Sequence, residues 1–69
     1  MYIDWSGRQV NIYNEYNAKM SVIYTDTDVV SAVLQGDRQI VVITKDRTNV
    51  YKRVNDSYIF NLWTSTQRL

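Results

Sequence analysis

Cysteine and histidine are both absent from this chain of 69 residues. The first absence excludes disulfides and thiolate metal sites, and the second removes the ordinary zinc ligand sets. Together they exclude the Ser-His-Asp and Cys-His arrangements of nucleophilic catalysis. The acidic residues fall almost entirely in predicted turns, where they are best interpreted as turn formers. We therefore expect a protein that is not an enzyme and that binds no cofactor.

Long hydrophobic runs and an excess of one charge are also missing. The longest apolar runs, VVSAVL and IVVI, are too short to cross a bilayer. The first ten residues, MYIDWSGRQV, lack the basic and apolar regions of a secretory signal, so we expect no membrane association and a cytoplasmic location, or the host cytoplasm if the protein is viral. Eight basic and seven acidic residues give a net charge of +1, which argues against binding through bulk charge.

The length predicts one all-β domain, residues 1–69. A chain this short buries only about 60% of the surface that its unfolded form exposes, so its stability is marginal. Disulfides, a structural metal or association are the usual remedies. Because the first two lack their ligands here, we expect a homo-oligomer or a complex with a partner protein.

Alternating apolar and polar residues predict seven short strands in an antiparallel meander. The strands are expected at 2–6, 9–14, 19–25, 29–34, 39–44, 48–54 and 58–63. Short segments rich in Gly, Asn, Asp and Ser separate them, and these residues favour turns. No window keeps a helical period over three turns. The strands could form blade-like sheets or close into a small barrel of the SH3 or OB kind.

Two of the predicted strands, 29–34 and 39–44, are apolar on both faces. Such a strand is covered on both faces, either by closure of a barrel or by another chain. Tryptophan and other large apolar residues are the candidates for these core or subunit contacts. The candidates are Trp5, Val30, Val41, Ile43, Phe60 and Trp63.

The segment NIYNEYN, residues 11–17, returns in altered form as NVYKRVN at residues 49–55. The likeness extends over residues 2–25 and 40–64, which could be a degenerate repeat or two hairpins that are alike by chance. Residues 29–63, VVSAVLQGDRQIVVITKDRTNVYKRVNDSYIFNLW, resemble a generic β-propeller blade, without the GH and WD signatures of WD repeats. That resemblance implies a binding platform assembled as a ring from several chains.

Basic residues concentrate between positions 38 and 53, with Tyr51 among them, and we expect Tyr13 and Tyr51 to be exposed or half-exposed. Basic side chains beside aromatic platforms are typical of sites for single-stranded nucleic acid. The other interpretation is solubilising charge that protects an edge strand from further pairing. The candidate binding residues are Tyr13, Arg38, Arg47, Tyr51, Lys52 and Arg53.

We expect a small protein-binding module that associates with itself and could act as a modulator or inhibitor of a partner protein. Two alternatives remain open, a small barrel that binds single-stranded nucleic acid and a ring that binds glycans.

Overall fold

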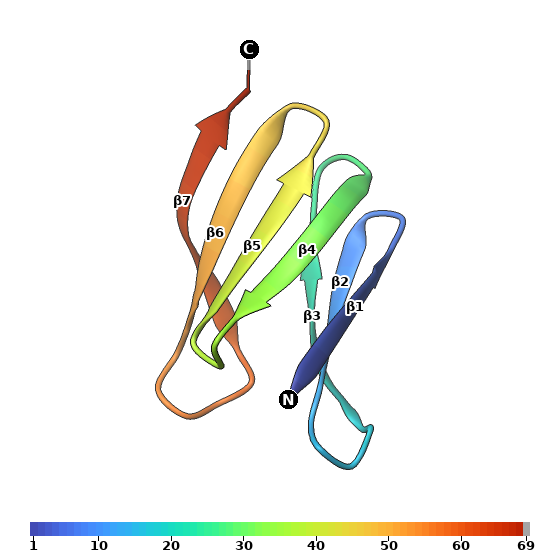
Figure 1. The fold of residues 1–69 in the computed structure, drawn as a ribbon, viewed down its shortest axis with the longest axis vertical. Coiled ribbons are helices and arrows are strands. Elements are labelled where there is room, and N and C mark those ends of the chain that lie inside the picture. The colour runs from blue at the N-terminus through green and yellow to red at the C-terminus, as the bar shows by residue number, and fades with distance from the viewer. Residues whose placement is uncertain (69) are drawn as a thin grey trace.

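The computed structural model of the protein describes residues 1–68, and in that range it contains seven antiparallel strands and no helix (Figure 1). The strands are β1 (Tyr2–Ser6), β2 (Gln9–Tyr13), β3 (Lys19–Tyr24), β4 (Val29–Gln35), β5 (Gln39–Thr44), β6 (Arg47–Arg53) and β7 (Phe60–Gln67). The predicted all-β meander is confirmed. Within the described range no helix is long and apolar enough to cross a membrane.

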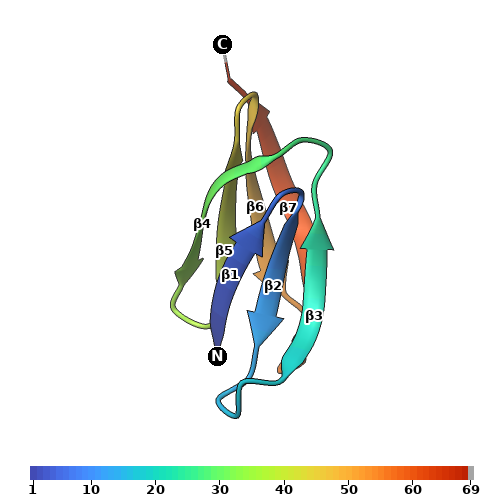
Figure 2. The ribbon, with the colours of Figure 1, turned by 90° about the vertical axis from the view of Figure 1, so that its right-hand side faces the viewer.

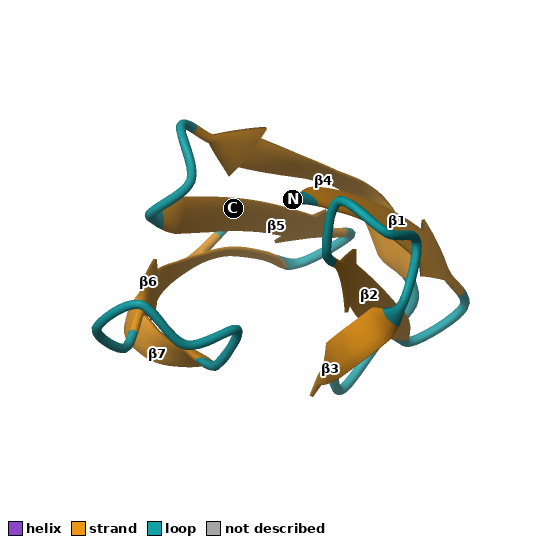
Figure 3. Cartoon of the chain, turned by 90° about the horizontal axis from the view of Figure 1, so that it is seen from below, coloured by secondary structure: helices purple, strands orange, loops and turns teal. Residues whose placement is uncertain are grey.

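The strands form two sheets, one in the order β1-β2-β3 and one in the order β4-β5-β6-β7. The sheets meet where β1 lies beside β4, and the backbone N–H of Val29 donates to the carbonyl of Gly7 at 2.8 Å there. On the opposite side, between β3 and β7, the assembly is open (Figure 3). A closed barrel was one of the two predicted architectures, and it is wrong, because β3 and β7 do not pair.

Turns join the strands where left-handed backbone conformations are required. Gly7 and Gly36 adopt φ values of 59° and 62°, and Asn17 and Asn55 adopt 66° and 52°. A Cβ atom at either glycine would meet nothing within 4 Å, so the requirement for glycine comes from the backbone angle and not from crowding. Asparagine is among the few other residues that tolerate this region.

The core lies between the two sheets, and the residues that β2 and β5 contribute to it alternate along each strand. Its largest fully buried side chains are Val10 and Ile12 of β2 and Ile40 and Val42 of β5. Burying each such side chain stabilises the fold by roughly 1.5–3 kcal/mol. The other buried apolar residues are Ile23, Ala32, Tyr51 and Phe60.

The two segments of the predicted repeat share local features. Their ladders shift register at Ile12/Tyr13 and at Val50/Tyr51, and both contain a left-handed asparagine at the matching position. Their orientation toward the core is opposite. Ile12 is buried and Tyr13 lies on the outer face, whereas Tyr51 is buried and Val50 lies on the outer face. The repeat itself stays a prediction.

Candidate functional site

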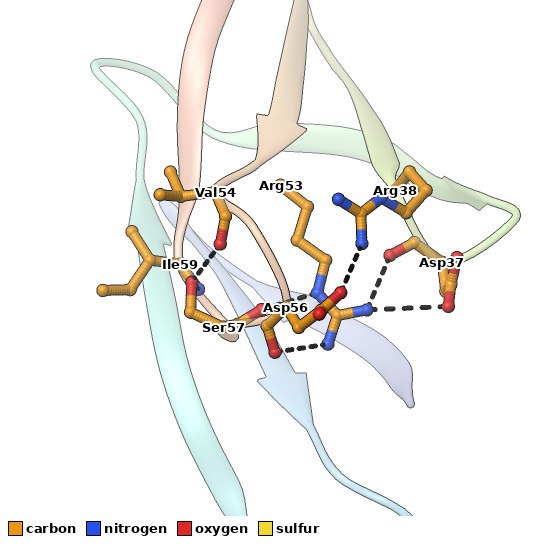
Figure 4. Close-up of polar contacts among 7 residues, drawn as sticks. All are labelled: Asp37, Arg38, Arg53, Val54, Asp56, Ser57 and Ile59. Carbon is orange, nitrogen blue, oxygen red and sulfur yellow. Dashed lines mark hydrogen bonds and ion pairs between the residues drawn. The ribbon is translucent and has the colours of Figure 1, made fainter.

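Arg53 connects two loops at the lower end of the β4–β7 sheet (Figure 4). Its guanidinium donates to the carbonyls of Ser57 at 2.5 Å, Asp37 at 3.1 Å and Asp56 at 3.3 Å. The Asp37 carboxylate lies 3.6 Å away, and only 10% of the Arg53 side chain is exposed. A cation held by so many acceptors has few donors left for phosphate, so Arg53 has a structural role.

The remaining basic candidates do not share one surface. Arg38 forms an ion pair with Asp56 at 3.1 Å and stays largely exposed. Arg47 lies on the inner side of β6, because it shares the parity of the buried Tyr51. Lys52 has the opposite parity and lies on the outer face, with its ammonium 3.7 Å from the ring centre of Trp63. The basic face predicted for nucleic acid is therefore not assembled in this chain.

The outer face of the β4–β7 sheet carries a row of apolar side chains. The ladder aligns Val33 with Val41 and Val41 with Val50, so the three lie side by side. Val33 is 51% exposed and Trp63 is 62% exposed. We call this surface the outer apolar face and define it as Val33, Val41, Ile43, Val50 and Trp63.

Trp63 reaches this face because β7 contains a bulge. Thr64 pairs with Val50 and Leu62 pairs with Tyr51, which leaves Trp63 without a partner in the ladder. An unpaired residue in a bulge can turn its side chain to a different face of the sheet. The ammonium of Lys52, an outer-face residue, contacts the indole ring, which places Trp63 on the outer side of the sheet.

Several candidates lie elsewhere than expected. Tyr51 was expected to be exposed or half-exposed, and this is wrong. The odd-numbered residues of β6, which are mostly polar, face inward, so the Tyr51 ring is buried. Phe60 belongs to the core. Trp5 at 41% exposure and Val30 at 59% do not, so within the described chain neither they nor Trp63 is a core residue. Any subunit contact that these three make stays a prediction.

Tyr13 lies on the outer face of the β1–β3 sheet in a polar network. Its ring stacks on Tyr2 with centres 4.8 Å apart, and its hydroxyl donates to Asp4 at 3.3 Å. Asp4 also accepts from the Asn11 side chain at 2.9 Å, and Asn11 accepts from Gln9. Burial, followed by the nearby Asp4 carboxylate, raises the pKa of Tyr13. The polar side chains of this cluster form hydrogen bonds with one another, which explains why the polar Asn11 can be buried.

A pocket of about 440 Å³ opens between the two edge strands, and we call it the open-edge pocket. β3 and the residues after it form one wall, and β6 and β7 form the other. Its lining consists of Tyr24, Thr25, Asp26, Arg47, Asn49, Tyr51, Leu62 and Ser65. Among the candidate binding residues it brings Arg47 and Tyr51 together. The other six lining residues were not predicted, because their proximity depends on how the two sheets meet.

Hydrogen bonds within the open-edge pocket order its polar wall. Arg47 donates to the Ser65 hydroxyl at 3.3 Å, and that hydroxyl donates to the Asn49 side chain at 2.5 Å. Burial is the main cause that raises the pKa of the Tyr51 phenol, and the Asp26 carboxylate adds to it. Neither Arg47 nor Asp26 forms an ion pair within residues 1–68. The lining of the pocket thus carries one cation, one carboxylate, one side-chain amide and four hydroxyl groups.

The lower end of the opening is closed by a contact between the sheets. The Ser21 hydroxyl of β3 donates to the carbonyl of Tyr58, in the loop before β7. The opening is therefore closed near Ser21 and open at the open-edge pocket. Residues 1–68 hold no group of three or more acidic side chains placed to share a metal ion.

No protein-family model, no curated protein and no solved structure matches this chain.

Proposed function

We propose that this protein is a non-enzymatic interaction module that binds a second copy of itself through the outer apolar face. The observation that carries the proposal is the aligned row of Val33, Val41 and Val50 on the uncovered side of the sheet. Single exposed apolar residues are normal, but a contiguous row next to an exposed tryptophan is typical of an interaction surface.

The small number of charged side chains on this face favours a second copy of the chain as its binding partner. Lys52 is the one charged side chain among the residues that the ladders place on this side. Two copies can therefore pack sheet against sheet without a cluster of like charges. Lys52 lies at the rim beside Trp63, where its ammonium can stay in water.

The size of the outer apolar face determines the expected strength of self-association. Four strands about 4.8 Å apart and six residues at about 3.3 Å each give a projected area of about 400 Å² per copy. A dimer built on this face alone buries on the order of 800 Å² in total, which is at the weak end of specific interfaces. We therefore expect association that is populated at high micromolar to millimolar concentration. A larger ring, and a role as modulator of a partner protein, stay predictions, as does a cytoplasmic location.

Dilution experiments by NMR test this proposal with residue resolution. Between millimolar and micromolar concentration, we expect amide shifts to change in β4, β5 and β6 around Val33, Val41 and Val50. Val33→Glu places a charge in the row and should abolish these changes, since an unpaired carboxylate is costly to bury. Tyr16→Glu, in the exposed turn after β2, is the matched control and should leave them unchanged. Concentration-independent spectra of the unmodified chain would overturn the proposal.

The nucleic-acid and glycan alternatives have less support. Arg38 and Arg53 are paired with carboxylates, while Arg47 and Lys52 lie on opposite faces. The Tyr2–Tyr13 cluster uses its polar groups internally. Titration with an unstructured oligonucleotide at low salt, and with a panel of sugars, would reveal either activity.

A further inference from the structure

The edge strand β7 lacks the protection that sheet edges usually carry. Charged residues, proline and short length discourage pairing of an edge with another strand. β7 extends over eight residues, FNLWTSTQ, and contains no charge and no proline. The basic strand β6 was expected to protect an edge, but it lies inside the sheet between β5 and β7. The free side of β7 can therefore accept a strand.

The direction of the strands determines what fits beside β7. All ladders are antiparallel, and β3 and β7 point the same way across the opening (Figures 1 and 2). The two edges cannot pair with each other and keep the antiparallel alternation. One additional strand, running opposite to both, continues it.

We propose that the opening binds a short extended peptide strand of a partner protein, antiparallel to β7, with one side chain in the open-edge pocket. This site is separate from the outer apolar face, and it does not depend on self-association. The bond between Ser21 and Tyr58 closes the lower end, so the peptide pairs with the upper part of β7, residues 64–67.

The hydrogen-bonding pattern between β6 and β7 shows which backbone groups of β7 can bond to an added strand. The N–H of Arg68 donates to the carbonyl of Asp46 at 2.7 Å, so Arg68 is bonded to the β6 side. Bonding alternates along an antiparallel strand, so Thr66 also faces β6, and Ser65 and Gln67 direct their N–H and C=O toward the opening. These two residues offer four backbone groups to an added strand.

The pocket selects the side chain that enters it. Tyr51 and Leu62 supply an apolar wall, and Asn49 and Ser65 supply hydrogen-bonding groups. Arg47 and Asp26 add one charge of each sign, so a side chain of either charge meets repulsion as well as attraction. A neutral side chain of medium size, such as an aromatic or an amide, has the chemistry that fits, and the volume of about 440 Å³ admits it.

A tethered strand tests this site without a known partner. A glycine-rich turn and a strand of about five alternating Thr and Val residues are appended after the last residue, so that the strand can return antiparallel to β7. Tethering gives an effective concentration in the millimolar range. We expect the amides of Ser65 and Gln67 to exchange with solvent at least about tenfold more slowly than in the unextended chain, because exchange then requires opening of the new pairs.

Two variants of the extended chain separate backbone pairing from side-chain effects. Ser65→Pro removes the N–H that faces the opening, and an edge position tolerates proline. Ser65→Ala loses the same hydroxyl but keeps the N–H. We expect protection at Gln67 to persist in Ser65→Ala and to be lost in Ser65→Pro, with the amides of Ile40 and Val42 unchanged in both as a check of the fold.

Unchanged exchange at both Ser65 and Gln67 in the extended chain would overturn the proposal, as would protection confined to β4 and β5. The latter result would place the tethered strand on the outer apolar face. Since the self-association test monitors β4 to β6 of the unextended chain, failure of one proposal is distinguishable from failure of the other.

Discussion

Arg53 and Arg38 both contact Asp56, but their surroundings differ. Arg53 is nearly buried and donates to three carbonyls, whereas Arg38 forms one exposed ion pair. Buried charge-assisted hydrogen bonds contribute far more to stability than exposed ion pairs. The density of bonds around Arg53 indicates that this side chain fixes the loop after β6 against the β4–β5 turn.

Arg53→Ala should lower the free energy of unfolding by about 2–3 kcal/mol, because it leaves three carbonyls without their donor. Arg38→Ala is the matched control and should cost less than about 1 kcal/mol. Urea unfolding followed by tryptophan fluorescence measures both. Equal losses in the two variants would contradict the structural role assigned to Arg53.

Asp46 titrates in a hydrogen-bonded turn between β5 and β6. Its carboxylate accepts from the Thr44 hydroxyl at 3.0 Å, which is the main cause that lowers its pKa below the ordinary value of 3.8. Thr27 donates to the same oxygen at 3.4 Å and adds to the effect. The folded chain therefore binds a proton at Asp46 less readily than the unfolded chain does.

The stabilisation from Asp46 should be complete above the ordinary carboxyl pKa and lost as the pH falls below 3.8 through the lowered folded value. Asp46→Asn should therefore flatten the decline of unfolding free energy in this acidic range. Glu15→Gln, which removes an exposed carboxylate in the turn after β2, should leave the decline as it is. Denaturant unfolding at a series of pH values compares the three proteins. A decline of the same steepness in all of them would refute the assignment.

The strands themselves were largely predictable from alternation and from turn residues. β1 and β5 have the predicted bounds, and Gly7 and Gly36 lie in the turns that follow β1 and β4. β7 was misplaced: it was expected at 58–63 and lies at Phe60–Gln67. Val54 and Ile59 close a loop through a backbone bond, and the polar residues after Trp63 pair with β6 although their sequence shows no alternation.

The orientation of strand faces was less predictable. In β6 the polar parity faces inward, so Tyr51 is buried and Val50 is on the outer face. In β5 the side chains on both faces of the strand are apolar, so no local pattern predicts whether Ile40 or Val41 faces the core. Only the packing of the two sheets determines which of them does, so the outer apolar face could not be predicted from the sequence.

As a whole, the two sheets enclose the core only in part. Two features stay uncovered, an apolar surface and an unpaired sheet edge. One is the outer apolar face, and the other is the opening between β3 and β7 (Figure 3). A chain of 69 residues has little core to spare, and partners are a common source of additional burial for such small folds. The short length predicted association, and the two sheets show which surfaces are available for it.

The solution mass of the unmodified chain, measured by light scattering from micromolar to millimolar concentration, tests self-association most directly. The monomer mass is 8.2 kDa. We predict a weight-average mass that rises with concentration toward at least twice this value, and a smaller rise for Val33→Glu. A mass that stays at 8.2 kDa up to millimolar concentration would contradict the account.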